Sequence, residues 1–251
     1  MTLMRAALVA LLLLVAAPLV NLFFMVPAAE LASSLADPAI AGALRTSLIA
    51  SLGSVGLAAL LGIPAGYVLA RGHGAPRAAA LFVLALPLAL PPVASGIALL
   101  GLLGTRESVG AFFAAHGFPV VDSLLGVAVA DFFVSGSVIA IAATAAFAQV
   151  DRTLEEAART LGAGTGRVLL TVALPLAAPS IAAGTLLAWL RALGEYGATS
   201  IVAYHPTSLP IALVVALSAD GVPRALALAE AFVGLAAFVA LIAALAQRRL
   251  T

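Results

Sequence analysis

Long apolar runs alternate with short polar stretches along this chain of 251 residues. A helix that crosses a bilayer needs about 20 predominantly apolar residues, and six runs reach that length. We expect these spans at about residues 6–28, 46–70, 78–103, 124–148, 168–198 and 225–246. A further apolar run at 207–219 is too short to cross, which favours a re-entrant or interfacial segment. The pattern predicts an all-α integral membrane protein with six transmembrane helices.

Prolines cluster near the middle or the start of two of the expected spans. Pro87, Pro91 and Pro92 lie in the third span, and Pro175 and Pro179 lie in the fifth. Proline removes a backbone donor and clashes with the preceding turn of a helix. Inside a bilayer the freed carbonyl groups need neighbouring helices or water. We therefore expect a broken helix in the third span that lines a cavity or packs against a partner, and a second break in the fifth.

The first span shares features with a secretory signal peptide, because Arg5 precedes its apolar run and Ala28 and Ala29 follow it. The run is longer than the core of a signal peptide, which is about 7 to 15 residues. This length favours a retained transmembrane helix over a cleaved leader. We assign residues 1–43 to this helix and to an external polar connector that covers about residues 29–45.

Composition narrows the possible chemistry. Hydrophobic residues make up 64% of the chain and charged residues 9%, with a mean hydropathy of +1.21. The chain has no Cys, which excludes disulfides, thiolate metal sites and thiol nucleophiles. All 12 basic residues are Arg, and a Walker A loop requires a Lys on the nucleotide phosphates. The chain therefore cannot be its own standard ATPase, and its net charge of +1 gives no indication of nucleic-acid binding.

One polar island, residues 151–175, separates the fourth and fifth spans. Its first nine positions contain five charged residues. Asp151 or Thr153 can cap a short helix there, and acidic residues in the first turn suit the helix dipole. Gly162 can end the helix in the left-handed conformation. The island predicts a short capped helix on the aqueous side of the membrane, which is suited to docking a partner.

The island also contains the pattern E-A-A-x3-G-x9-V-x-L-P. The pattern is formed by Glu156, Ala157, Ala158, Gly162, Val172, Leu174 and Pro175. It resembles the EAA motif of the permease subunits of ABC importers, in which this helix couples to an ATPase subunit. The resemblance implies a coupling helix near residues 151–166 within a type I ABC permease domain at 44–248. It assigns ATPase coupling to Glu155, Glu156, Ala157, Ala158, Arg159, Gly162 and Pro175.

Two further strings resemble the permeases for molybdate and tungstate, and resemble those for sulfate somewhat less. They are PLALPPVASGIALLGLLG at 87–104 and RALGEYGATSIVAY at 191–204. The resemblance implies a homodimer that works with two copies of an ATPase subunit and an external oxyanion-binding protein. ATP and Mg would be used by the ATPase, and this chain would bind no cofactor or metal. A sulfate or thiosulfate permease of the same class stays open as an alternative.

Ionisable residues inside the membrane are costly and are therefore candidates for function. Arg191 and Glu195 are four residues apart, so they share a helical face with Thr199. A guanidinium can pair with two oxygens of a tetrahedral oxyanion. We assign Arg191, Glu195 and Thr199, with Pro91 and Pro92, to the translocation path or its gate. A purely structural Arg191–Glu195 pair is the alternative.

Arginine placement predicts the topology. With the N-terminus inside the cell, eight arginines fall on the inner side and three on the outer side. The inner set is Arg5, Arg71, Arg77, Arg152, Arg159, Arg167, Arg248 and Arg249, and the outer set is Arg45, Arg106 and Arg224. This asymmetry obeys the positive-inside rule. It predicts a multi-pass protein of the plasma (cell inner) membrane with both termini in the cytoplasm.

No nucleophile–base constellation is visible, and the three histidines lie apart in loops without the spacing of a zinc site. We therefore expect a non-catalytic membrane subunit. A secondary transporter or channel that works without ATP is the alternative from another class. The coupling pattern argues against that alternative, because only an ATP-driven transporter needs such a helix.

Overall fold

The computed structural model describes residues 1–247, with side chains described through residue 241. All regular elements in this part of the chain are helices, which confirms the predicted fold class. The elements are α1 (Thr2–Met25), α2 (Ala28–Leu35), α3 (Pro38–Arg71), α4 (Gly74–Ala89), α5 (Pro92–Leu103), α6 (Ser108–Ala115), α7 (Leu124–Ala148), α8 (Arg152–Thr160), α9 (Thr165–Val168), the π-helix η1 (Leu169–Ala173), α10 (Leu174–Leu193), α11 (Thr199–Val202), α12 (Leu209–Ala219) and α13 (Val222–Gln247).

Five stretches are long and apolar enough to cross a membrane: α1, α3, α7, α9 to α10, and α13. The third expected span is broken, as the prolines predict: α4 ends at Ala89 and α5 begins at Pro92 after a bend of 113°. At 1.5 Å per residue, α4 alone is about 24 Å long. Only α4 therefore runs along the bundle, and α5 turns away from it.

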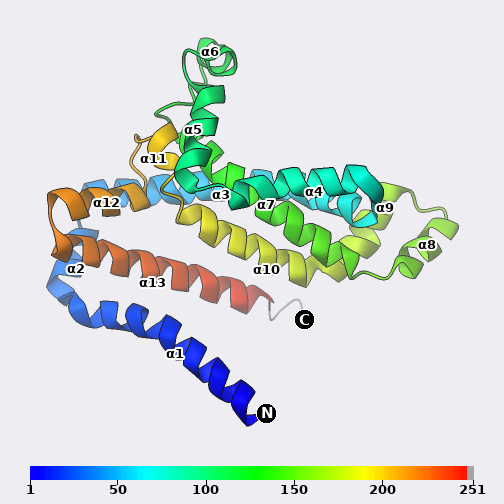
Figure 1. Cartoon of the computed structure of the whole chain (residues 1–251), viewed down its shortest axis with the longest axis horizontal. Coiled ribbons are helices and arrows are strands. Elements are labelled where there is room, and N and C mark those ends of the chain that lie inside the picture. The colour runs from blue at the N-terminus through cyan, green and yellow to red at the C-terminus, as the bar shows by residue number, and fades with distance from the viewer. Residues whose placement is uncertain (248–251) are drawn as a thin grey trace.

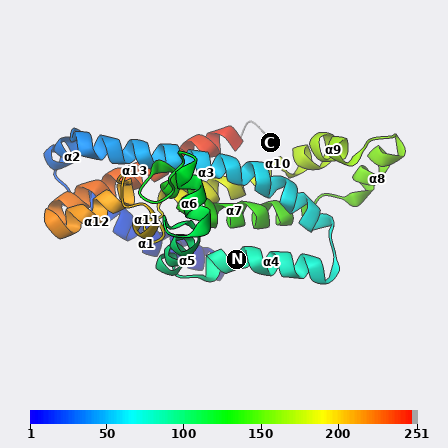
Figure 2. The same cartoon turned by 90° about the horizontal axis from the view of Figure 1, so that it is seen from above.

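The long helices lie along one axis of the molecule (Figures 1 and 2). α3, α7 and α10 run side by side, and α8 lies beyond them at one end. The turn between α12 and α13 lies at the opposite end. α5 and α6 project sideways from the bundle in Figure 1. α1 lies against α13 and buries none of its own residues.

Glycines allow α3, α7 and α10 to approach one another closely. A Cβ atom added to Gly66 on α3 would lie 2.6 Å from the Ala143 Cβ on α7, and one on Gly62 would lie 3.2 Å from the Ala140 amide nitrogen. A Cβ atom on Gly184 of α10 would lie 2.5 Å from the Ala142 Cβ. Contacts of this kind replace the hydrophobic driving force that helices lack in lipid.

The stretch expected to be a polar connector, residues 29–45, is largely helical. α2 occupies its first part, and α3 begins at Pro38. Asp37 caps α3 by accepting a hydrogen bond from the Ala39 amide at 2.8 Å. Proline fits the first turn because its missing N–H would have no partner there. The domain boundary placed after residue 43 therefore falls inside a continuous helix.

The fifth span differs from its prediction in two ways. Pro175 and Pro179 distort the helix without breaking it, because the π-helix η1 precedes Pro175 and widens the turn. α10 then ends at Leu193 and does not reach residue 198.

The loop expected at 104–123 also contains a helix, α6.

The short apolar run at 207–219 forms α12, which has 11 residues and does not cross the bundle, in agreement with its predicted shortness. α12 packs between the start of α3 and α13. The buried residues of this contact are Ile40, Ala43, Leu209, Ala212, Ala216 and Leu228.

Candidate functional site

The helix α8 has the local structure that its sequence predicts. The Asp151 carboxylate caps it by accepting a hydrogen bond from the Thr153 amide at 2.9 Å, and this bond lowers the pKa of Asp151. At the other end Gly162 adopts φ +87°, in the left-handed region. The Gly162 amide donates to the Arg159 carbonyl at 2.9 Å. The structure thus has the predicted cap at Asp151 and the predicted left-handed glycine at Gly162, and the helix between them ends at Thr160.

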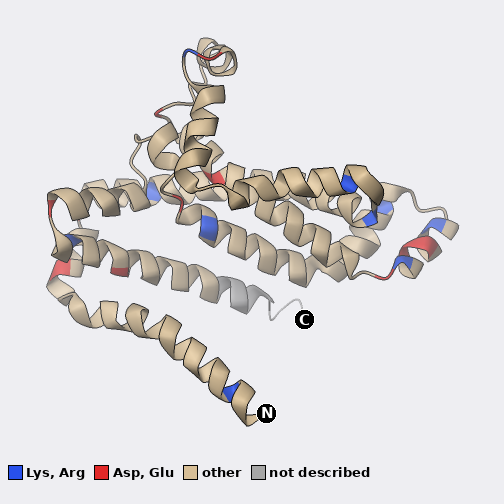
Figure 3. Ribbon diagram, viewed as in Figure 1, with Lys and Arg blue, Asp and Glu red and all other residues tan. Residues whose placement is uncertain are grey.

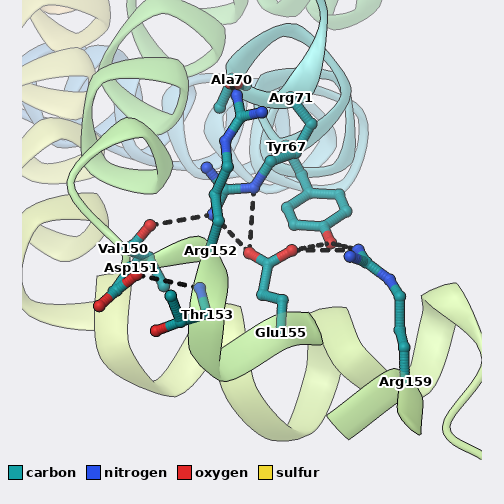
Figure 4. Close-up of polar contacts among 9 residues, drawn as sticks. All are labelled: Tyr67, Ala70, Arg71, Val150, Asp151, Arg152, Thr153, Glu155 and Arg159. Atoms are coloured by element: carbon teal, nitrogen blue, oxygen red, sulfur yellow. Dashed lines mark hydrogen bonds and ion pairs between the residues drawn. The ribbon is translucent and has the colours of Figure 1, made fainter. Parts of the chain in front are cut away.

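Glu155 faces the bundle and is 1% exposed. Its carboxylate accepts hydrogen bonds from the Tyr67 hydroxyl at 2.8 Å and from Arg71 Nε at 3.0 Å (Figure 4). Arg159, one turn further along α8, donates to the same carboxylate at 3.1 Å. We call this cluster of four side chains the clamp: Glu155, Tyr67, Arg71 and Arg159. The clamp joins α8 to the last turn of α3.

The electrostatics of the clamp keep Glu155 ionised. Burial alone would raise the pKa of this carboxyl group. The hydrogen bonds from Arg71 and Tyr67, together with the charges of Arg71 and Arg159, outweigh the burial and lower the pKa. Arg71 also lies over the Tyr67 ring, with 5.6 Å between its guanidinium carbon and the ring centroid. A buried carboxylate with three donors is a stable anchor.

Two bonds to backbone carbonyl groups extend this attachment. Arg71 donates to the carbonyl of Val150, just before α8, at 3.3 Å. Arg152, in the first turn of α8, donates to the Ala70 carbonyl at 3.3 Å. The carbonyl groups at a helix C-terminus carry a partial negative charge that favours such cations. Each element therefore donates a hydrogen bond to the backbone of the other: α3 to the residue before α8, and α8 to the end of α3.

The opposite face of α8 is open. Glu156 and Ala157 are exposed, Leu154 is 48% exposed, and Leu161 just after the helix is 90% exposed. Ala158 is half-buried. This surface combines one carboxylate with two large apolar side chains, which suits a docked protein.

The structure separates the residues that we assigned to ATPase coupling. Glu156, Ala157 and Gly162 lie on the exposed side, as a docking role requires. Glu155 and Arg159 instead belong to the clamp, where they are bonded to each other. Pro175 lies on α10, outside the α8 helix itself.

Arg191 and Glu195 form the expected pair, with Arg191 Nη1 2.6 Å from Glu195 Oε2. Glu195 does not lie within the helix as expected, because α10 ends at Leu193. It lies in the turn before α11, where its other oxygen accepts a hydrogen bond from the Ala198 amide at 2.9 Å. The Glu195 side chain is 1% exposed, whereas that of Arg191 is 41% exposed. Part of the Arg191 side chain therefore remains exposed, and its guanidinium donates to no other described residue.

The broken third span meets this turn. A Cβ atom on Gly197 would lie 2.5 Å from the Pro92 Cβ, so the start of α5 packs directly against the segment between Glu195 and Thr199. Thr199 is buried, and its hydroxyl group has no hydrogen-bond partner among the described residues. Pro91 is the extended residue before α5. The structure thus brings together both sets of residues assigned to the path or gate.

Asp131 on α7 is buried close enough to Glu195 and Arg191 for their charges to interact.

Within the described side chains, no group of three or more His, Cys, Asp and Glu could hold a metal ion.

Sequence reasoning missed Tyr67 and Arg71. They lie 88 and 84 residues before Glu155, so no local spacing connects them to it. The available signal was weak: a tyrosine and an arginine end an otherwise apolar span, one turn apart.

A family model described as "Binding-protein-dependent transport system inner membrane component" matches residues 62–251, which include all of α8. The chain belongs to this family of ABC transporter permeases. The match confirms the resemblance based on the EAA pattern, and it disfavours the secondary transporter considered from composition. The permease is also an all-helical, multi-pass membrane protein by its own spans.

Relatives of the permease have names that describe oxyanion transport. A probable molybdenum ABC transporter permease of Haloferax volcanii is 36% identical over 87% of this chain and 80% of its own. The molybdate/tungstate transport system permease WtpB of Thermococcus kodakarensis is 36% identical over 73% of this chain and 69% of its own. The sulfate transport system permease CysW of Synechocystis is 34% identical over 67% of this chain and 61% of its own.

The fold is that of a solved importer. A chain in the crystal structure of a bacterial ABC transporter that imports the acidic polysaccharide alginate superposes with a TM-score of 0.69. The alignment covers 100% of the permease and 95% of that chain at 17% sequence identity. At this identity the likeness establishes the fold alone.

Proposed function

We propose that this permease passes molybdate or tungstate into the cell as the membrane subunit of an ATP-driven importer. The observation that carries the proposal is α8, a capped polar helix with an EAA pattern that lies at one end of an apolar bundle and exposes Glu156. The relatives named for molybdenum, molybdate and tungstate favour this cargo.

The α8 end of the bundle would face the cytoplasm, with both termini on the same side. Figure 3 supports this orientation, because basic residues lie on α8 and on the adjoining ends of the long helices. Cytoplasmic ends of membrane proteins carry an excess of Arg and Lys. Arg248 and Arg249, which we count on that side, lie outside the described residues. The membrane would be the plasma (cell inner) membrane.

Two copies of an ATPase subunit would bind the exposed faces of two α8 helices and would use ATP and Mg there. The permease itself would bind no cofactor and hydrolyse nothing. An external binding protein would deliver the anion to the opposite end of the bundle and supply most of the selectivity. Closure of the ATPase would displace α8, and the spans would exchange an inward-facing path for an outward-facing one.

Two copies of the permease would form a homodimer with the anion path at its two-fold axis. α5 and α6 leave the bundle and expose large apolar side chains such as Ile97, Phe112 and Phe113. A second copy or lipid would cover these side chains.

Arg191 would be a transient partner of the anion on this path. Its guanidinium has one carboxylate partner, and its side chain is partly exposed. Glu195 would orient Arg191 and weaken its hold on the anion, because both compete for the same donors. The contact between Pro92 and Gly197 would let α5 follow movements of this turn.

The test is the ATPase activity of the permease reconstituted with its ATPase and binding protein, at matched concentrations of molybdate, tungstate and sulfate. We expect stimulation by molybdate and tungstate and none by sulfate. Stimulation by sulfate would change the cargo, as the likeness to the sulfate permease allows, and would leave the coupling role intact. A thiosulfate arm tests the remaining member of that alternative.

Two substitutions test the docking role of α8. Glu156→Lys reverses the exposed charge, and Gly162→Pro is incompatible with φ +87°. We expect both to uncouple transport while the protein still inserts and dimerises. Gly164→Pro is the matched control, because Gly164 already has φ −70°. Wild-type transport by either α8 variant with the ATPase present would contradict the docking role.

A further inference from the structure

Glu155 is the one buried residue of α8, all of which the structure describes. A helix of nine residues is too short to be stable alone in water. Its position therefore depends on tertiary contacts. α8 lies near α9 and η1, but the contacts of its buried residue, Glu155, are polar. The bonds of Glu155 to Tyr67 and Arg71, and the two backbone bonds, join α8 and its start to the end of α3.

The chain connection that follows α8 is poorly suited to transmit movement. α8 is followed by Gly162 in a left-handed turn and then by Gly164, and a Cβ atom at either glycine would meet nothing within 4 Å. Such a turn adapts easily when α8 moves. The clamp, in contrast, is a buried set of charge-assisted hydrogen bonds, which are about twice as strong as neutral ones.

We propose that Tyr67 and Arg71 are positioning residues that pass a displacement of α8 through Glu155 directly to α3. This inference rests on the proposed function, in which an ATPase moves α8. α8 then has two faces. Glu155 on one face binds the end of α3, and Glu156 and its exposed neighbours on the other face bind the ATPase.

α3 is well built to carry such a movement. It is a continuous helix of 34 residues that runs the length of the bundle. Near the clamp Tyr67 packs edge-on against Phe147, with ring centroids 5.3 Å apart. Further along, the Trp189 indole donates to the Ser51 hydroxyl at 3.1 Å and so joins α3 to α10. Trp189 lies two residues before Arg191, so the route ends beside the proposed anion contact.

The decisive variant is Glu155→Gln, with Glu156→Gln as its matched control. The first substitution keeps the shape of the side chain but removes the buried charge that faces Arg71 and Arg159. We expect Glu155→Gln to bind the ATPase and hydrolyse ATP while anion transported per ATP falls about tenfold or more. Glu156→Gln should have the opposite phenotype: weaker ATPase binding, but a normal transport ratio once the ATPase is saturating.

A charge reversal, Glu155→Arg with Arg71→Glu, covers the case in which Glu155→Gln fails to fold. It restores an ion pair between α8 and α3, so it should recover much of the transport ratio lost in Arg71→Glu alone. Tyr67→Phe keeps the packing on Phe147 and both ion pairs, and it should lower the ratio by a smaller factor.

A spectroscopic readout separates transmission from mere support of the helix. The chain has no native Cys, so a fluorophore can be attached through Gly164→Cys just after α8 or Leu187→Cys on α10, two exposed sites. ATP should change the signal at both sites in the otherwise wild-type complex. With Glu155→Gln the change at 164 should persist and the change at 187 should disappear.

The outcomes are distinct. A normal transport ratio in Glu155→Gln, or a persistent signal at 187, would overturn the transmission role. Loss of ATPase binding in Glu155→Gln would overturn it as well, because Glu155 would then support docking. Failure of the unmodified permease to bind any ATPase would instead remove the proposed function on which the inference rests.

Discussion

Two carboxylate–guanidinium pairs with the same spacing in the sequence differ in how many further hydrogen-bond donors surround the carboxylate. Glu155 and Arg159 on α8, and Arg191 and Glu195 at the end of α10, are each four residues apart. Both carboxylates are buried to the same degree. Glu155 gains two further donor residues from α3, so its pair is closed. The two arginine side chains are similarly exposed, at 43% for Arg159 and 41% for Arg191. Glu195, however, gains only a backbone amide, and Arg191 donates to Glu195 alone, whereas Arg159 also donates to Tyr67, so the second pair is open.

The difference shows that local spacing makes a pair but does not decide its use. A buried carboxylate surrounded by donors from two helices becomes an anchor, because any departure leaves a charge without partners. A pair with spare donors can exchange one oxygen ligand for another. We therefore assign rigidity to the α8 pair and ligand exchange to the α10 pair.

The largest expected effect concerns the open pair. Arg191→Ala should lower anion transport about tenfold or more, since a hydrogen-bonded charge is lost from the path. ATPase binding should remain. Transport into proteoliposomes and co-purification of the ATPase measure the two properties.

The double variant Arg191→Ala with Glu195→Gln decides why transport falls. If the loss came only from a buried carboxylate left without its partner, neutralising Glu195 would restore transport. We expect no restoration, because the anion contact itself is missing. Loss of dimer assembly in Arg191→Ala would favour the structural alternative.

The second effect tests whether the closed pair depends on a fixed α3. Gly66→Val inserts a side chain where even a Cβ atom would lie 2.6 Å from Ala143. We expect a destabilisation of roughly 1–3 kcal/mol from overpacking, with faster hydrogen exchange in α8. Thermal unfolding in detergent measures the first quantity, and mass spectrometry of amide exchange measures the second.

Gly56→Val is the matched control for Gly66→Val. It lies on the same helix, and a Cβ atom there would meet nothing within 4 Å. Its effect on unfolding should be small. Equal destabilisation by both variants would mean that helix propensity, and not the contact with α7, governs the result.

A smaller effect concerns the local cap that α8 has in addition to the clamp. Asp151→Ala removes the acceptor of the Thr153 amide. We expect amide exchange in the first turn of α8 to become about fivefold faster. Asp151→Asn should retain most of the protection, because Asn caps helices well. Unchanged exchange in Asp151→Ala would show that the clamp alone holds the helix.

The smallest expected effect is that of mild acid on the stability of α8. The folded pKa of Glu155 is lowered, so its contribution to stability is present above the ordinary value of 4.5 and is lost as the pH falls through the folded value. Exchange protection of α8, corrected for the intrinsic rate, should therefore not change from pH 7.5 down to about pH 5.5. A loss of protection within that window would contradict the ionised, fully bonded clamp.

Much of the molecule could be predicted from local patterns in the sequence. The apolar runs predicted the spans, because a bilayer imposes both a length and a composition on a helix. Asp151 and Gly162 predicted the ends of α8, since caps depend on neighbouring residues. Spacing alone predicted the pair of Arg191 and Glu195. Pro91 and Pro92 predicted the break in the third span.

Tertiary structure decided the rest. The sequence placed Glu155 beside Glu156 as two similar acidic residues, and only the approach of α3 turned one inward and left the other exposed. Tyr67 and Arg71 meet Glu155 across more than 80 residues of chain. Likewise the prolines implied a break, but the 113° bend of α5 depends on its packing against Gly197 and α11. Such contacts follow from how helices pack in three dimensions, and no local spacing encodes them.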